Sequence, residues 1–372
     1  MTKIFLTGAT GYIGGQALHA LTEEHPEYQV SALVRDSTKA GAVRSAFPPR
    51  ARRRGRPGRR VGRVGRGVQG RRGSPLGGHG PSAQRAHDPR DSREATQEPT
   101  RYAVPGLPIR CDYPPAAIYP PRLTGPPAYW VQISGATALA AAELADESRV
   151  PGSPSDVVFD DLSGIGRIRD LIQAHPSRAV DNYVLSVAAR DPQIHTALLL
   201  GPVIYGRGRG PVHQRSVQIP ELARATLQRR RGLQVGRGLS RWGNVHVEDV
   251  GALVLRLVER AVAGTSAAEA WNLNGVYLLG VGEETFGAIS HRVAAVAAQK
   301  GLIPDGDQVD ELLGEEADTW LPHGTVLYGT NARGSAGRAR RVLGWVPRHE
   351  NGLDDEIPRA VDEEAEALGR VA

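Results

Sequence analysis

The chain has 372 residues and a formal charge of +6, and it contains a single cysteine, Cys111. One cysteine excludes an intramolecular disulfide, and no apolar stretch approaches the roughly 20 residues that span a bilayer. No cleavable leader precedes the first apolar run, so we expect a soluble cytoplasmic protein without membrane association. The basic charge is local: residues 41–126 hold 18 arginines and 5 acidic residues, a balance of +13, which leaves −7 on the rest.

The first 36 residues have the pattern of a strand, a glycine turn, a helix and a second strand. Residues 3–7 form a short apolar run, residues 14–24 carry small and apolar side chains at helical spacing, and residues 29–34 form the second strand. A unit of this length predicts two parallel strands joined by a helix.

Regular periodicity is lost between residues 41 and 126, where arginine, glycine and proline dominate. We expect this segment to be irregular or disordered. Alternating strand and helix signals return afterwards, with an apolar strand near 129–134, a buried strand in HTALLLGPVIYG, and a short helix ending at Gly344. An amphipathic helix follows His246, and we expect Asp249 to cap it. The fold class predicted is α/β with a doubly wound parallel sheet.

Three glycines, Gly8, Gly11 and Gly14, lie between the first strand and the first helix. Glycine permits a tight turn and a close approach of backbone to a pyrophosphate, while the helix N-terminus attracts its negative charge. The motif therefore predicts dinucleotide binding, with contacts from Thr7, Gly8, Thr10, Gly11, Tyr12, Ile13 and Gly14. The alternative is a plain glycine-rich turn.

The end of the second strand bears on which dinucleotide is preferred. Arg35 precedes Asp36, with Ser37 and Lys39 close by. A carboxylate at this place binds the ribose hydroxyls of NAD, whereas cations receive the 2′-phosphate of NADP. Arg35 and Lys39 favour NADP(H) over NAD(H), although both would also suit an exposed helix start.

These features together resemble the extended short-chain dehydrogenase/reductases, the NAD-dependent epimerase/dehydratase family. The likeness is carried by TGATGYIGG, YWVQISGAT, GPVIYGRGRGP, WGNVHVEDVGAL and RRVLGWVP, in the family's order. The resemblance implies a Rossmann domain over residues 1–250, interrupted by 41–126, and an interleaved substrate lobe over 203–350. It also implies a small-molecule or nucleotide-sugar substrate, and a homodimer is the assembly we expect.

The family's catalytic residues are only partly matched. Ser134 stands where the family's serine polarises the substrate oxygen. The family's Tyr-x-x-x-Lys pair is missing: starting from Tyr183 places Val187 at the lysine position, and counting back from GPVIYG places Arg178 and Asn182 at the two positions. The candidate catalytic residues are therefore Ser134 and Tyr183, with Tyr183 otherwise a packing aromatic.

Other polar residues have weaker claims. Arg207, Arg209, Arg215, Arg241 and Trp242 fall where family members bind a sugar-nucleotide diphosphate, or they serve only as surface residues. His246 and Asp249 have the residue types of an acid–base pair, but His246 alternates with valines as a strand residue does, and Asp249 suits a helix cap. His195 and His213 lack partners at metal-ligand spacing, so we expect no metal.

Three interpretations of residues 41–126 compete: an RNA-binding arm, a disordered insertion, and a displaced reading frame. No aromatic side chain interrupts residues 49–73 for base stacking, so we expect no nucleic-acid partner. The codons of Arg56-Pro57-Gly58-Arg59-Arg60, with CGN for arginine, can encode Asp-Leu-Asp-Asp when read one base later, an acidic segment of the kind the family places after its third strand. Sequencing the transcript decides between a frame error and a real insertion.

The function predicted is hydride transfer between a nicotinamide dinucleotide and a carbonyl or hydroxyl of a small molecule or nucleotide sugar, as in an oxidoreductase or epimerase. The alternative is a non-catalytic NADP(H)-sensing protein, which the missing Tyr/Lys pair favours.

Overall fold

The structure is a computed structural model that describes residues 2–47, 126–264, 267–349 and 352–370. Most of the arginine-rich segment, and with it the question of its reading frame, lies outside these residues. The chain on either side of that segment, residues 1–50 and 122–372, forms one compact unit.

The N-terminal elements follow the predicted order. Two bounds differ from the prediction: the first helix starts at Tyr12 and not at residue 14, and the second strand ends at Leu33 and not at residue 34. The elements are β1 (Lys3–Thr7), α1 (Tyr12–Glu24), β2 (Gln29–Leu33) and α2 (Ser37–Ala46). β1 and β2 are parallel, with Lys3 opposite Gln29 and Thr7 opposite Leu33. The expectation of irregular chain from residue 41 is wrong up to residue 47, because α2 continues to Ala46.

The reason that α2 forms is local. The Asp36 side chain accepts a hydrogen bond from the Lys39 N–H at 2.9 Å and caps the helix. Val43 is buried at 8% exposure and belongs to a small cluster with Ala9 and Leu18. The other face of the β1–β2 ladder is exposed in the described part of the chain: Phe5 is 70% exposed and Leu33 is 55% exposed.

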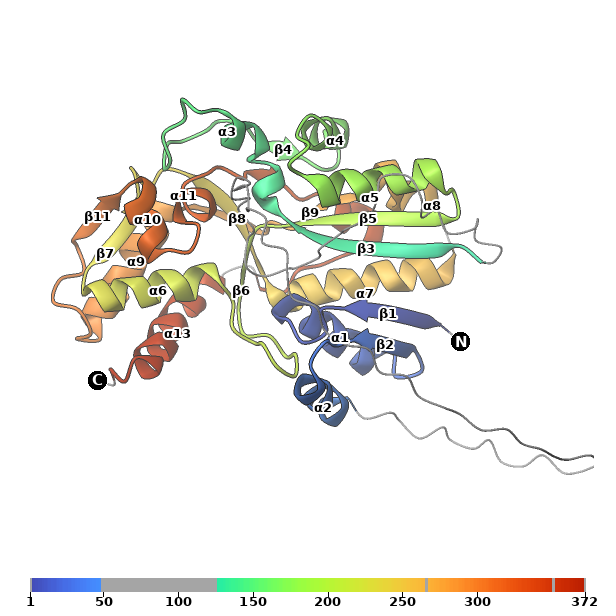
Figure 1. Ribbon diagram of the computed structural model, residues 1–372, viewed down its shortest axis with the longest axis horizontal. Coiled ribbons are helices and arrows are strands. Elements are labelled where there is room, and N and C mark those ends of the chain that lie inside the picture. The colour runs from blue at the N-terminus through green and yellow to red at the C-terminus, as the bar shows by residue number, and fades with distance from the viewer. Residues whose placement is uncertain (1, 48–125, 265–266, 350–351, 371–372) are drawn as a thin grey trace, which may run out of the picture. The chain divides into compact units, whose positions relative to one another are not determined.

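The central ladder has the strand order β3-β5-β9, and both of its pairings are parallel. Its strands are β3 (Ala128–Gly135), β5 (Ile194–Gly201) and β9 (Val276–Leu278). Figure 1 shows α5 (Ala179–Arg190) along one side of this ladder and α7 (Val247–Ala263) along the other. Helices on both faces of parallel strands confirm the α/β, doubly wound prediction.

The remaining strands form short ladders. β6 (Val203–Tyr205) is parallel to β8 (Arg241–His246), which pairs antiparallel with β10 (Gly282–Thr285). β7 (Gly232–Val235) is parallel to β11 (Val309–Leu312), and β4 (Phe159–Asp160) is parallel to β12 (Gly334–Ser335).

Further helices complete the described part of the chain. They are η1 (Ala136–Ala138), α3 (Ala141–Ala145), α4 (Ile165–Gln173), α6 (Gln218–Arg229), α8 (Ala267–Ala270), η2 (Asn272–Asn274), α9 (Phe286–Gln299), α10 (Gly314–Trp320), α11 (Gly324–Leu327), α12 (Arg338–Leu343) and α13 (Gly352–Ala367). α12 ends at Gly344 with a φ of 63°, which confirms the helix end predicted there.

Several elements within the residues expected to form the substrate lobe pack against one another. α6 packs against α9 and against α13, and β7 packs against α9. α13 begins at Gly352, so this group continues beyond the expected boundary at residue 350. The buried residues of these helices, such as Leu222, Val293 and Ile357, join the large core cluster. The division into two domains stays a prediction.

No helix in the described ranges is both long enough and apolar enough to cross a membrane.

Candidate functional site

The glycine turn has the geometry that the sequence predicts. Gly8 adopts a φ of +73°, a conformation that favours glycine, and its carbonyl accepts the Gly11 N–H at 2.8 Å. A Cβ at Gly14 would lie 2.2 Å from the Gly8 carbonyl oxygen, so only glycine fits where α1 leaves the turn. The first turn of α1 therefore lies directly against the end of β1, where its free N–H groups suit a phosphate.

The turn is fastened to a loop that follows β6. The Tyr12 hydroxyl donates to the carbonyl oxygens of Tyr205 and Gly206 at 2.8 and 2.7 Å. The His213 N–H donates to the Thr10 carbonyl at 3.3 Å, and Gly15 and Gly210 are in close backbone contact. The Tyr12 hydroxyl is thus committed to protein carbonyls, which leaves its backbone as the predicted cofactor contact.

The residues predicted to select the dinucleotide lie at the start of α2. Arg35 and Lys39 are exposed, while the carboxylate of Asp36 between them caps the helix. Their positions suit either ribose hydroxyls or a 2′-phosphate, and the preference for NADP(H) stays a prediction.

Ser134 is the last residue but one of β3, and its hydroxyl meets a guanidinium. Arg178 Nη2 donates to Ser134 Oγ at 3.2 Å, and Arg178 Nη1 donates to Thr137 Oγ1 at 3.0 Å. The same guanidinium donates through Nε to Asp181 Oδ2 at 2.8 Å. Asp181 is almost fully buried, since its side chain is 3% exposed, and the Arg178 side chain is 20% exposed.

The structure does not bring Tyr183 to Ser134, so the predicted catalytic pairing of these two residues lacks support. Tyr183 is 52% exposed and its ring contacts Trp130 and the Arg190 guanidinium. Tyr183 lies two residues after the buried Asp181, or about 200° around the helix, so the two side chains leave α5 on opposite faces. Arg178, the alternative position, makes the contact instead.

Asn182, at the family's lysine position in this register, serves the backbone. Its Nδ2 lies within hydrogen-bond distance of the carbonyl oxygens of Ile172, His175 and Arg178, at 3.0 to 3.2 Å. An amide engaged in this way closes the loop between α4 and α5. Asn182 therefore does not supply the fixed cation that lowers a tyrosine pKa in the family.

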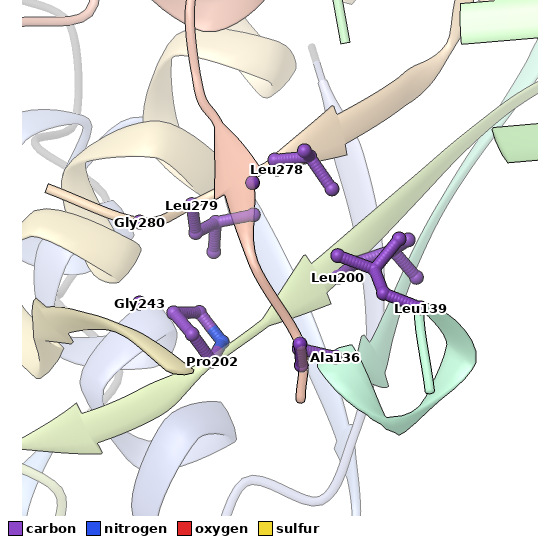
Figure 2. Close-up of a pocket in the computed structure, with 10 residues that line it drawn as sticks. Ala136, Leu139, Leu200, Pro202, Gly243, Leu278, Leu279 and Gly280 are labelled. Atoms are coloured by element: carbon purple, nitrogen blue, oxygen red, sulfur yellow. The ribbon is translucent and has the colours of Figure 1, made fainter. Parts of the chain in front are cut away.

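An apolar pocket opens where the central strands end (Figure 2). It is narrow, with a cavity volume of about 10 Å³ that holds about one water molecule, and its ten lining residues are all alanine, leucine, proline or glycine. Ala136 follows β3, Pro202 follows β5 and Leu279 follows β9, so the pocket lies at the carboxyl ends of these parallel strands. In open α/β sheets this edge is where ligands bind.

Three of the four arginines expected to bind a diphosphate are paired with carboxylates. Arg215 contacts Glu364 and Glu221 at 2.6 and 2.7 Å, and Arg209 contacts Glu248 at 2.8 Å. Arg241 lies 3.7 Å from Glu283. Trp242 is buried, and its indole N–H donates to the Thr330 carbonyl. Arg207 donates to the Gln214 side chain. These pairings give the group a structural role.

The predicted cap of α7 is wrong in its residue. His246 is the N-cap, and its Nδ1 accepts the Glu248 N–H at 3.2 Å. Asp249 is buried instead, and its carboxylate accepts the backbone N–H groups of Arg348 and His349 at 2.8 and 3.2 Å. Asp249 thus ties the segment before α13 to the start of α7.

His246, Glu248 and His349 each offer a metal-ligand atom, and these atoms lie within 4.8 Å of one another. The two imidazoles are stacked, with centroids 3.8 Å apart and planes 23° apart. A metal ion bound by two histidines lies near the plane of each imidazole ring. Two stacked rings do not place a single ion near both planes. Glu248 is also paired with Arg209. We assign this group to packing.

His246 gives the fold a pH dependence. Burial, aided by the adjacent His349, lowers its pKa from the ordinary 6.5 to about 4, although Glu248 opposes the shift. Between these two values the unfolded chain binds a proton that the folded chain does not, so stability falls as pH drops from 6.5 to 4. We expect the urea midpoint to fall over this range and to fall less in His246→Asn, which keeps a capping oxygen.

The matched control is His291→Asn, at an exposed position on α9. An equal pH dependence in His246→Asn and in the unaltered protein would contradict the assignment.

Comparison with known proteins gives likenesses of different extent. No family model matches the sequence. An oxidase, ucsJ, from Acremonium sp. is 29% identical over 384 residues, covering 99% of each chain. Among solved structures, UDP-glucuronic acid 4-epimerase from Bacillus cereus in complex with UDP-glucuronic acid and NAD is 13% identical, with a TM-score of 0.48, over 98% of this chain and 100% of that one.

Two further structures match over shorter stretches. PbgP3 from Burkholderia pseudomallei is 14% identical with a TM-score of 0.42, over 65% of each chain. MoeE5 in complex with UDP-glucose and NAD is 18% identical with a TM-score of 0.39, over 64% of this chain and 66% of that one. The chain therefore spans just under two thirds of the length of PbgP3 and MoeE5.

Proposed function

We propose that this chain is an NAD(P)-dependent oxidoreductase of the extended short-chain dehydrogenase/reductase type. The observation that carries the proposal is the glycine turn between α1 and β1, a strand that pairs parallel with β2. A Cβ at Gly14 in this turn would meet the Gly8 carbonyl at 2.2 Å. Such a turn fits a pyrophosphate, because it brings bare backbone and a helix N-terminus together. A nicotinamide dinucleotide bound there supplies or accepts hydride.

Residues in three places would contact the cofactor and the substrate. The backbone of Gly8, Gly11 and Ile13 would hold the phosphates, and Arg35 and Lys39 would contact the adenosine ribose or its phosphate. Ser134, at the carboxyl end of β3, would hold the substrate oxygen. The relative named an oxidase, which matches 99% of each chain, supports redox chemistry over epimerisation.

A second candidate is a dinucleotide-sensing protein without turnover. It is favoured by one observation: Asn182, which stands at the family's lysine position when the register is counted back from GPVIYG, is engaged with three backbone carbonyls.

The test is titration with NADH and NADPH by calorimetry, followed by absorbance assays at 340 nm with aldehydes, ketones and UDP-sugars. Micromolar binding with turnover of one class supports the oxidoreductase. Binding without turnover across the panel leaves the sensor, and no binding of either dinucleotide contradicts both. Ser134→Ala serves as the active-site control.

A further inference from the structure

We propose that Glu283 is a specificity-determining residue. Its carboxylate occupies the anion site that the guanidinium groups of Arg241 and Arg333 would otherwise offer, and so excludes substrates that place a phosphate or diphosphate group there. The substrate class that remains is uncharged at this place. The inference rests on the proposed function for its place in a reaction, and its test measures anion binding without turnover.

The first step is the set of contacts that Arg333 makes. Its Nε donates to both carboxylate oxygens of Glu283 at 3.1 Å, and its Nη2 lies 3.0 Å from Oε1. Its Nη1 donates to the Ser155 carbonyl at 2.9 Å. All three nitrogens of the guanidinium therefore have an oxygen partner. The Glu283 carboxylate lies where the fork of an arginine binds the carboxylate or phosphate of a ligand.

Arg241 approaches the same carboxylate from the neighbouring strand. Its Nη1 lies 3.7 Å from Oε1 of Glu283, the oxygen that Arg333 Nη2 also contacts. At this distance the two groups form an ion pair without a hydrogen bond, and the Arg241 side chain is 44% exposed. The Arg241 guanidinium thus keeps N–H donors for a neutral acceptor, such as a hydroxyl or carbonyl oxygen.

The pairing of the strands explains why these side chains meet. β8 and β10 are antiparallel, with Glu283 opposite Gly243, and Arg241 lies two residues before Gly243 on the same strand. Residues two apart on a strand share a face, so Arg241 and Glu283 are diagonal neighbours. Arg333 is held beside them because the Ala332 N–H donates to the Arg241 carbonyl at 2.9 Å.

The cluster of Arg241, Glu283 and Arg333 adjoins the carboxyl ends of the central strands. Gly243, opposite Glu283, is one of the residues that line the apolar pocket there, and so are Ala332 and Gly334 on either side of Arg333. Ligands of open α/β sheets bind at this edge. A substrate bound there would therefore meet the charges of the cluster.

The last step concerns charge. A phosphate that approaches Arg241 also approaches the Glu283 carboxylate, and like charges a few ångströms apart repel each other. A repulsive group within a site contributes to specificity as much as attractive contacts do. An uncharged substrate meets no such repulsion and still finds the donors of Arg241.

The experiment compares the unaltered protein with Glu283→Gln, which keeps the shape of the side chain and an oxygen that accepts N–H groups from Arg333. Inorganic pyrophosphate is titrated by calorimetry into the full chain with saturating NADH, which keeps the glycine turn occupied. We expect Glu283→Gln to bind pyrophosphate at least about tenfold more tightly, because a repulsive charge is lost and two cations lose their partner. Salt at about 0.5 M should reduce this gain by screening.

The matched control is Glu284→Gln, at the next residue of β10. It removes the same charge from a side chain of similar exposure, 29% against 27% for Glu283. Adjacent residues of a strand face opposite sides, and Glu284 pairs with Arg292 at 2.7 Å. We expect the pyrophosphate affinity of Glu284→Gln to equal that of the unaltered protein. Adding Arg241→Gln to Glu283→Gln should remove the gain.

One measurement does not depend on the folding of Glu283→Gln, which urea unfolding checks. Arg241→Gln alone should leave the pyrophosphate affinity of the protein unchanged, because Glu283 already closes the site to anions. A loss of affinity in Arg241→Gln would overturn the inference. So would equal affinity in the unaltered protein and in folded Glu283→Gln, or an equal gain in Glu284→Gln.

Failure of this inference and failure of the proposed function give different results. Turnover of a UDP-sugar by the unaltered protein would overturn the role of Glu283 and leave the oxidoreductase standing. A protein that binds neither dinucleotide contradicts the proposed function alone. The titrations without NADH then still test Glu283, since the glycine turn is the same in every variant.

Discussion

Gly14→Ala is expected to weaken NADH and NADPH binding by about a hundredfold, because an added Cβ costs up to about 3 kcal/mol where it overpacks a closed contact. That Cβ would lie 2.2 Å from the Gly8 carbonyl oxygen and 2.7 Å from its carbonyl carbon. Both partners are backbone, so the turn itself must open. Fluorescence titration measures the affinity, and urea unfolding measures the accompanying loss of stability.

The control for this substitution is Gly166→Ala in α4. A Cβ there meets only the Arg169 side chain, at 3.8 Å, an ordinary contact. We expect unchanged dinucleotide binding and equal or slightly higher stability, since alanine favours a helix by up to about 1 kcal/mol over glycine. Equal dinucleotide affinity in Gly14→Ala and Gly166→Ala would show that the turn is not the binding site.

Asp181→Asn is expected to destabilise the fold by about 3 kcal/mol, because it leaves a largely buried guanidinium without its counter-charge. Arg178→Met should cost a similar amount, since it strands the buried carboxylate of Asp181. The double variant should cost about 2 kcal/mol less than the sum of the two, which is the coupling expected of residues in direct contact. Urea denaturation at pH 7 gives all four free energies of unfolding.

A second ion pair with the same spacing provides the comparison. Arg256 and Glu259 on α7 are also three residues apart, but their side chains are 53% and 31% exposed. Their cycle should give a coupling below about 0.5 kcal/mol, as exposed pairs do. If the Arg178–Asp181 coupling is equally small, the pair does not hold the guanidinium against Ser134 and Thr137.

Local patterns were sufficient to predict the N-terminal unit. β1 has the predicted bounds, the helix differs at its start and β2 at its end by one or two residues, and the glycine turn has the backbone that its spacing indicates. Glycine spacing works as a predictor because the turn and close approach depend on atoms within a few residues. The part of α2 beyond residue 40 was not predicted. Its one buried apolar residue, Val43, lies among glycine and arginine residues and gives no helical periodicity.

The site was predicted only in part, because it depends on contacts distant in sequence. Ser134 lies at the end of β3 as expected, and its assigned role stays a prediction. Counting back from GPVIYG placed Arg178 at the tyrosine position of the family's Tyr/Lys pair, whereas residue type favoured Tyr183 for that position. The choice depends on how α5 is rotated against β5, which one sequence does not specify. The signal available was the Arg178 and Asp181 spacing, with the acid in the first helical turn.

The exchange of roles between His246 and Asp249 has a similar cause. Aspartate at a helix start is a good cap, so residue type indicates Asp249. The structure uses its carboxylate for the N–H groups of Arg348 and His349, which are about 100 residues away. A partner at that separation leaves no periodic signal around residue 249.

The central claim is that the glycine turn between β1 and α1 binds a nicotinamide dinucleotide. The most direct measurement is a crystal structure of the full chain with NADH or NADPH bound. We expect the pyrophosphate against the backbone of Gly8 to Gly14. Pyrophosphate density elsewhere in the chain would contradict the account.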